Sequence, residues 1–313
     1  MSAIEVITAG PLTSVQDFGR FGAQRYGLAP SGAMDRLSLA AANALVGNPL
    51  SAPAIEIGPI KTVLRAHGGP LCVALAGALR FAHRGDDLCP LYRTFLLRDG
   101  EVLTLDAARK GVFSYLAVAG ALKGEAVFGS FSVNARAGLG SPVPRPLRSG
   151  DRLEFENAEA SRELSRSMVP PVFGEGAIRT VAGPQFDEFG VSARTFFDSP
   201  WQISPASDRM GYRLEGPRLT HAGNFNIVSD GTVDGSIQIV GNGQPIVLMK
   251  DRGTTGGYPK IATIISADFG RFAQTRPRHT LRFEMIDVTT AQQEARAFHA
   301  LLHSLPEKIR TDA

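Results

Sequence analysis

The sequence predicts a mainly β protein of two domains, and three observations carry this prediction. The chain contains 34 glycines and 20 prolines, which divide it into many short apolar runs of strand length. Asn242-Gly243 and Asp99-Gly100 each separate two such runs, as the turn of a β-hairpin does. A length of 313 residues leaves room for two modest hydrophobic cores.

The first half of the chain alternates apolar runs with turn residues and contains one helical segment. Strands are expected at Ile4–Thr8, Ala54–Ile57, Thr62–Leu64, Leu71–Ala76, Thr94–Leu97, Val102–Leu105 and Val112–Val118. A helix is expected before Gly47 and Pro49, because apolar residues recur at helical spacing at Met34, Leu37, Ala41, Ala44 and Leu45.

A change of composition at residues 157–176 predicts the boundary between the two domains. This stretch is polar and charged and then carries Pro170-Pro171. We therefore expect a first domain at 1–160, a second at 175–290, and a helix and tail at 291–313. A short helix followed by a strand is expected at residues 192–204. Further strands are expected at Ile178–Val181, Ile237–Val240, Ile246–Met249 and Ile261–Ile265.

The tail has the pattern of an amphipathic helix that packs on the domain surface. Its apolar residues fall on one helical face, at Ala291, Ala295, Phe298, Leu302 and Leu305.

Composition and missing motifs exclude several classes of protein. A net charge of +3 indicates neither nucleic-acid nor membrane binding, and no apolar run has the length of a membrane span. Cys72 and Cys89 form no disulfide framework, and the N-terminus lacks a signal peptide, so a cytoplasmic protein is expected. The sequence contains no Gx4GK[ST] loop, no GxGxxG after a strand, no HExxH and no GxSxG. No metal site is expected.

The stretch from Asp251 to Lys260 is the most unusual connection in the chain. It contains three glycines and two threonines, and it brings Lys250, Arg252 and Lys260 close together although the chain has only six lysines. Glycines let backbone N–H groups converge, and nearby cations attract an anion. The alternative is a solvated turn whose glycines only satisfy the backbone geometry.

Two further clusters of polar residues are candidates for a site. The loop Thr13–Arg20 offers Gln16, Asp17 and Arg20, and Asp35 follows where a carboxylate suits the first turn of a helix. The stretch Ser207–Gly216 offers two guanidinium groups, Arg209 and Arg213, that suit a carboxylate. In both clusters the polar side chains could instead tie loops together.

Several long motifs together resemble one family. They are TSVQDFGRFGAQRYG, SGAMDRLSLAAANALVGNP, SDRMGYRLEG, GSIQIVGNGQPIVLMKDRGTTGGYPKIATII and FAQTRPRHTLRF. The chain resembles the biotin-dependent-carboxyltransferase-like family, also called allophanate hydrolase subunit 2, from its first loop to about Phe283. The resemblance implies two cyclophilin-like β-barrel domains. Three positions depart from the family's usual pattern: Asp234, Gly253 and His279.

For an activity, the resemblance implies the C subunit of a 5-oxoprolinase-type complex, which opens 5-oxoproline to glutamate at the expense of ATP. A lactam is a resonance-stabilised amide, so phosphorylation of its carbonyl oxygen would let water attack the carbon. Such a site needs cations for the anionic groups and donors for the developing oxyanion. The catalytic candidates are the cations Lys250, Arg252 and Lys260, with Asp17 or Asp251 to place water or move a proton. The substrate-binding candidates are Gln16, Arg20, Arg209, Arg213, Gln238, Thr254, Thr255, Gly256, Gly257 and Tyr258.

The resemblance also implies partners and leaves two other functions open. Proteins like the A and B subunits of 5-oxoprolinase are the expected partners, with ATP bound by the complex rather than by this chain. The first alternative is carboxyl transfer from carboxybiotin to urea, with the biotin carried by another polypeptide. Lys250 is followed by Asp251 and the glycine-rich loop, so we expect no biotin on this chain. The second alternative is a non-catalytic regulator, because one family member binds and antagonises a kinase inhibitor.

Overall fold

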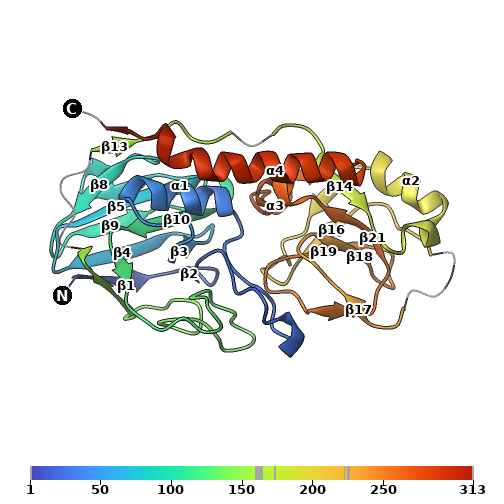
Figure 1. Ribbon diagram of the computed structural model, residues 1–313, viewed down its shortest axis with the longest axis horizontal. Coiled ribbons are helices and arrows are strands. Elements are labelled where there is room, and N and C mark those ends of the chain that lie inside the picture. Colours follow the sequence, from blue (N-terminus) through green and yellow to red (C-terminus); the bar gives the residue numbers. More distant parts are fainter. Residues whose placement is uncertain (1, 159–164, 173, 222, 224–225, 312–313) are drawn as a thin grey trace. The chain divides into compact units, whose positions relative to one another are not determined.

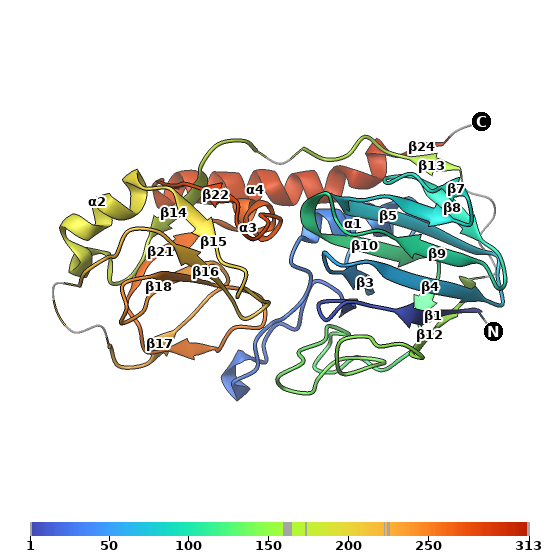
Figure 2. The same cartoon turned by 180° about the vertical axis from the view of Figure 1, so that it is seen from behind.

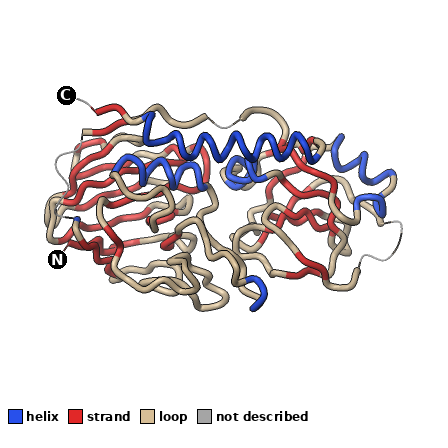
Figure 3. Tube along the Cα trace, viewed as in Figure 1, coloured by secondary structure: helices blue, strands red, loops and turns tan. Residues whose placement is uncertain are grey.

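The protein consists of two compact units. The computed structural model describes residues 2–158, 165–172, 174–221, 223 and 226–311. Unit 1 comprises Met1–Phe21, Ser31–Val172 and Leu301–Ala313, and unit 2 comprises Gly22–Pro30 and Phe173–Ala300. Strands form the body of each unit (Figure 3), which confirms the expected mainly β fold. The limits expected for the domains, 1–160, 175–290 and 291–313, stay a prediction, and residues 159–164 and 173 of the expected boundary lie outside the described part.

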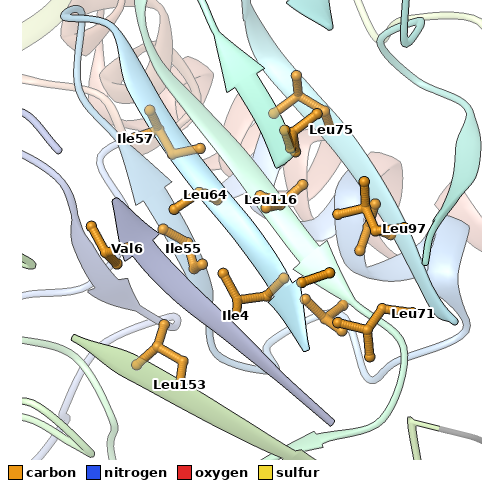
Figure 4. Packing of buried hydrophobic residues seen from close by; sticks show 14 of the residues in the cluster. Ile4, Val6, Ile55, Ile57, Leu64, Leu71, Leu75, Leu97, Leu116 and Leu153 are labelled. Atoms are coloured by element: carbon orange, nitrogen blue, oxygen red, sulfur yellow. The ribbon is translucent and has the colours of Figure 1, made fainter. Parts of the chain in front are cut away.

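Unit 1 is built from two antiparallel sheets. The first has the order β11 (Ala121–Leu122), β12 (Arg152–Glu156), β1 (Ser2–Thr8), β4 (Thr62–His67), β9 (Val102–Leu105), β6 (Ala82–Arg84) and β7 (Asp87–Leu88). The second has the order β2 (Ser14–Gln16), β3 (Ala54–Ile57), β10 (Lys110–Val118), β5 (Leu71–Leu79) and β8 (Thr94–Leu97). Apolar side chains of both sheets form one core (Figure 4), among them Ile4 and Leu64 of the first sheet and Ile55 and Leu116 of the second.

Helix α1 (Arg36–Val46) lies beside β5 and β10 in unit 1 (Figures 1 and 2). Asp35 is its N-cap, because Asp35 Oδ1 accepts a 3.1 Å hydrogen bond from the Ser38 amide. Gly47 ends the helix in the left-handed conformation, with φ at 80°. The expected helix is therefore confirmed, and Asp35 has a structural role at its start.

The hairpin expected at Asp99-Gly100 is wrong. The turn itself forms, since the Glu101 amide donates to the Arg98 carbonyl at 3.0 Å. However, the strands on its two sides belong to different sheets: β8 pairs with β5, whereas β9 pairs with β4 and β6. The turn carries the chain from one sheet to the other, and local turn chemistry does not specify which partners the flanking strands take.

Unit 2 is built on one eight-stranded sheet. Its order is β22 (Thr280–Leu281), β15 (Trp201–Ile203), β16 (Gly211–Glu215), β19 (Pro245–Leu248), β18 (Ser236–Ile239), β21 (Lys260–Ile264), β14 (Ile178–Ala182) and β23 (Phe283–Met285). The β18–β19 pair is the hairpin expected at Asn242-Gly243, with Gly243 at φ 79°. Four buried aromatic side chains contribute to the core: Phe196, Trp201, Phe272 and Phe283.

Short elements complete the two units. Unit 2 carries α2 (Val191–Asp198), α3 (Ser266–Ala273), η1 (Gln24–Tyr26), η3 (Phe186–Phe189) and the small ladder of β17 (Asp230–Gly231) with β20 (Thr255–Gly256). The tail forms α4 (Val288–Ser304) and η4 (Leu305–Lys308), and β24 (Arg310–Thr311) pairs with β13 (Arg166–Ser167). The expected tail helix is confirmed. Leu302 is its buried residue, and Leu305 is buried just beyond it.

Candidate functional site

The basic residues of the loop between β19 and β21 are buried in unit 2. Lys250 and Arg252 are each 3% exposed, and Lys260 is 2% exposed. A buried cation is costly unless it is paired and hydrogen-bonded. The burial of all three cations does not fit a solvated turn, and it directs attention to their partners.

Those partners are two aspartates on one short segment, Asp230–Asp234, which we call the acidic strap. Lys250 Nζ lies 2.7 Å from Asp234 Oδ2, and Arg252 Nη1 bonds the other oxygen of the same carboxylate. Lys260 Nζ lies 2.9 Å from Asp230 Oδ2. The side chains of the strap acids are more exposed than those of the cations, at 25% for Asp234 and 49% for Asp230. The strap therefore supplies carboxylates to cations that belong to the loop.

Hydrogen bonds hold the acidic strap along the loop. Strand β17 of the strap pairs with β20 of the loop, so that Asp230 lies opposite Gly256. Thr232 then continues the contact, because its amide donates to the Thr254 carbonyl at 3.1 Å and its hydroxyl donates to the Gly253 carbonyl at 2.6 Å. The relative position of acids and cations is thus set by backbone pairing as well as by charge.

Arg209 and Arg213 have different surroundings. Arg209 donates to both oxygens of Asp251, from Nε at 2.9 Å and from Nη2 at 3.1 Å, and both residues are buried. Arg213 lies on β16 between the buried Tyr212 and Leu214, so its side chain is on the opposite, exposed face of the strand. Both carboxylate oxygens of Asp251 are thus engaged by Arg209. The catalytic role of Asp251 stays a prediction.

Two of the remaining loop residues, Gly256 and Tyr258, lie next to Gln238 on β18. Gln238 Nε2 donates to the Tyr258 carbonyl at 3.3 Å, and a Cβ on Gly256 would come within 2.3 Å of that nitrogen. A Cβ on Gly257 would meet no atom closer than 3.6 Å. Neither glycine has a left-handed φ. Gly256 therefore leaves room for the close approach of the Gln238 amide, and its backbone conformation is one that other residues also adopt.

Charge and burial shift two pKa values in this cluster. Burial lowers the pKa of Arg252, and the carboxylate of Asp234 only partly opposes this effect. The hydrogen bond from Lys260 holds the pKa of Asp230 below its usual value. Arg252 also has a buried Nε for which the described residues provide no hydrogen-bond acceptor. The described residues thus offset only part of the cost of burying the Arg252 guanidinium.

Asp17 in unit 1 is surrounded by donors. Its carboxylate accepts hydrogen bonds from the Gly19 amide, the Ser130 hydroxyl and the Phe131 amide, each at 2.7 Å, and from the Ser132 hydroxyl. These four hydrogen bonds engage the carboxylate in the local structure of the loop. This geometry favours a structural role, and the proposed use of Asp17 as a base stays a prediction.

Gln16 and Arg20 tie the same loop to its neighbours. Gln16 accepts from the Gly32 amide at 3.1 Å and donates to the Val133 carbonyl at 3.1 Å. Arg20 donates to the Ser132 carbonyl at 2.6 Å. The structure thus places Gln16, Asp17 and Arg20 together in unit 1 and the other candidates in unit 2.

Sequence reasoning missed the acidic strap as the source of counterions. Asp230 and Thr232 were not among the candidates, and Asp234 was noted only as a departure from a family pattern. The available signal was weak: two acids four residues apart, just before a strand. Within the described ranges, no group of three or more His, Cys, Asp or Glu residues could hold a metal ion, and no helix is long and apolar enough to cross a membrane.

Its fold and its cluster of charges define this chain as a mainly β protein of two barrel-like units, in which buried cations are paired with aspartates. The chain matches the family described as "Carboxyltransferase domain, subdomain A and B" over residues 26–285, and it belongs to this family. The resemblance drawn from the sequence motifs is thereby confirmed.

Individual relatives cover almost the whole chain. It is 37% identical to the C subunit of the 5-oxoprolinase of Escherichia coli (strain K12), over 94% of this chain and 96% of that protein. It is 33% identical to the C subunit of the 5-oxoprolinase of Haemophilus influenzae, over 92% and 93% respectively. The crystal structure of the K. lactis urea amidolyase superposes with a TM-score of 0.88 at 26% identity; it covers 98% of this chain, which spans 21% of that protein.

Proposed function

We propose that this chain is the C subunit of an ATP-dependent 5-oxoprolinase-type complex that cleaves 5-oxoproline to glutamate. The observation that carries the proposal is its 37% identity to the C subunit of a 5-oxoprolinase, along nearly the full length of both chains. The name of that relative implies further subunits. We therefore place this chain in a cytoplasmic complex with partners that resemble the A and B subunits of 5-oxoprolinase.

The cation cluster of unit 2 has the chemistry that such a reaction needs. 5-Oxoproline carries a carboxylate, and phosphorylation of its lactam oxygen by ATP would add further negative charge. Water then attacks the carbonyl carbon and the C–N bond of the ring breaks, which leaves an acyl phosphate of glutamate, with ADP as the other product of ATP. A second water hydrolyses this acyl phosphate to glutamate and phosphate. Lys250, Arg252 and Lys260 would bind the anionic groups, and the hydroxyls and amides of the 254–257 segment would donate to the developing oxyanion. ATP is the co-substrate of the complex, and we assign no nucleotide site to this chain.

The test is reconstitution of the complex. The full chain is co-expressed with its A-type and B-type partners, and glutamate released from 5-oxoproline is measured with and without ATP. We expect ATP-dependent release by the complex and none by the purified single chain. Robust turnover by the chain alone would contradict the proposal that the activity is divided among several chains. If the complete assembly shows no turnover, the proposal that 5-oxoproline is the substrate is wrong.

The similarity to the K. lactis urea amidolyase supports a second candidate, carboxyl transfer from carboxybiotin. The same cations would then hold the transferred carboxylate. The distinguishing measurement is bicarbonate-dependent carboxylation of urea after addition of a biotin carboxylase and a biotinylated carrier protein. Urea carboxylation without 5-oxoproline cleavage would replace the first proposal by the second.

A further inference from the structure

Asp234 is a carboxylate shared by two buried cations. Its Oδ2 contacts Lys250 Nζ at 2.7 Å and its Oδ1 contacts Arg252 Nη1. Both cations are 3% exposed, whereas the side chain of Asp234 is 25% exposed. Asp234 is therefore the outer member of the group, and it lowers the charge that this group presents by one unit.

Arg252 has one edge of its guanidinium held by Asp234 and the other edge poorly satisfied. Nη2 reaches only the Thr232 carbonyl, at 3.4 Å, and Nε finds no acceptor among the residues that the structure describes. Buried polar groups are almost always hydrogen-bonded, so such an exception calls for an explanation. The Nε–Nη2 edge is also the edge on which arginine binds a carboxylate with two parallel hydrogen bonds.

The pKa of Arg252 also supports binding of a second anion at the Nε–Nη2 edge. Burial lowers the pKa of the guanidinium, and Asp234 offsets this only in part. An added anion would stabilise the charged form further. The neutral Thr232 carbonyl, which belongs to the acidic strap, is the group that such an anion would replace.

We propose that Asp234 is a specificity-determining residue, which makes this cluster select a monoanionic carboxylate over a dianionic phosphoryl group at the Nε–Nη2 edge of Arg252. The proposal rests on the proposed function, because it names the part of the substrate that the cluster holds. The carboxylate of 5-oxoproline is a ligand of this class.

The selection follows from Coulomb's law. The repulsion between Asp234 and a ligand grows in proportion to the charge of the ligand, so a dianion is repelled twice as strongly as a monoanion at the same distance. At an effective dielectric of about 20 and a separation of about 5 Å, this difference corresponds to roughly 100- to 300-fold in relative affinity. Loss of the Asp234 charge should therefore favour phosphate over a carboxylate by about that factor.

The experiment is calorimetric titration of the full-length chain with 5-oxoproline and, separately, with inorganic phosphate at mildly alkaline pH. The variants are Asp234→Asn, which removes one negative charge with little change in shape, and Asp234→Asn combined with Lys250→Gln, which returns the local charge to its original value. Asp187→Asn is the matched control, since it makes the same change of charge at another aspartate of unit 2. Trp201 fluorescence on heating checks that each variant is folded.

We expect the unmodified chain to prefer 5-oxoproline, Asp234→Asn to shift the preference towards phosphate by at least about 100-fold, and the double variant to regain the original preference. Asp187→Asn should leave the preference unchanged.

A shift in Asp234→Asn no larger than in Asp187→Asn would overturn the proposal, and so would a lack of 5-oxoproline binding by the unmodified chain. If Asp234→Asn alone does not fold, the double variant decides, because failure to prefer 5-oxoproline at restored charge contradicts the proposal. Failure of the proposed function appears separately, as absent glutamate release by the complex.

Discussion

At the scale of single residues, Lys260 offers the clearest test of the cation cluster. Its ammonium group is buried, but its partner Asp230 is half-exposed, with 49% of the side chain accessible. A buried pair that loses one partner normally leaves a charge without compensation. Here the remaining carboxylate lies where water can hydrate it, so a substitution of Lys260 tests ligand binding with a limited effect on folding.

For Lys260→Met we expect ATP-dependent glutamate release by the assembled complex to fall about 30- to 1000-fold, because a charge-assisted contact in a shielded site is worth about 2–4 kcal/mol. Methionine keeps most of the side-chain volume, so the melting temperature should change little. Arg194→Ala is the control, since its side chain is 89% exposed and its loss should cost less than about 1 kcal/mol. Near-normal turnover by Lys260→Met would reduce the Asp230–Lys260 pair to a structural contact.

At the scale of elements, one buried carboxylate joins helix α3 to strand β14. Asp268 in the first turn of α3 accepts from the Arg179 amide at 2.9 Å and from Arg179 Nη2 and Arg271 Nη2, each at 2.7 Å. Burial raises the pKa of Asp268, but the hydrogen bonds from Arg179 and Arg271 outweigh it and leave the pKa below its usual value. This contact therefore stabilises unit 2 only while the carboxylate is charged.

The sign of its pH dependence follows from linkage. Because the folded-state pKa lies below the unfolded-state value, the stabilisation is complete above the unfolded-state pKa of about 3.9 and is lost as the pH falls through the folded-state pKa. Asp268→Asn should lower the free energy of unfolding by about 2–4 kcal/mol near neutral pH. The difference from the unmodified protein should shrink progressively in acid.

Urea denaturation followed by Trp201 fluorescence measures this effect, because Trp201 is the single tryptophan and is buried in unit 2. Asp198→Asn is the control, with its side chain 72% exposed; a change within about 0.5 kcal/mol is expected there. A constant difference between Asp268→Asn and the unmodified protein down to strongly acid pH would argue against the charged contact.

At the scale of the whole molecule, the end of the chain completes unit 1. The residues from Leu301 onward belong to that unit, although the preceding stretch, Phe173–Ala300, belongs to unit 2. Leu305 is 1% exposed, η4 contacts α1, and β24 pairs with β13. The core of unit 1 therefore depends on residues from both ends of the sequence.

For Leu305→Ala we expect unit 1 to lose about 2–4 kcal/mol of stability through the missing apolar contacts and the cavity that remains. Hydrogen exchange should become faster in peptides from β5, β10 and α1, while Trp201 fluorescence should report unchanged unfolding of unit 2. Val228→Ala, at a position that is 93% exposed, is the control. Faster exchange confined to residues 178–285 would contradict the assignment of the tail to unit 1.

By itself, the sequence determined the parts of this protein that depend on neighbouring residues. The period of apolar residues predicted α1 and α4, the Asn242-Gly243 turn predicted the β18–β19 hairpin, and the long motifs identified the family. These features are local because helix periodicity, capping and tight turns involve residues only a few positions apart.

Only the tertiary structure decided which distant groups meet. The Asp99-Gly100 turn was predicted as a hairpin but joins two sheets, because strand pairing depends on the whole core rather than on the turn. The loop cations were predicted from composition, yet their pairing with Asp230 and Asp234 was not, since the β17–β20 ladder sets that contact. Burial then determines what those charges can do, because the free energy of a buried cation depends on the carboxylates and donors that the fold places around it.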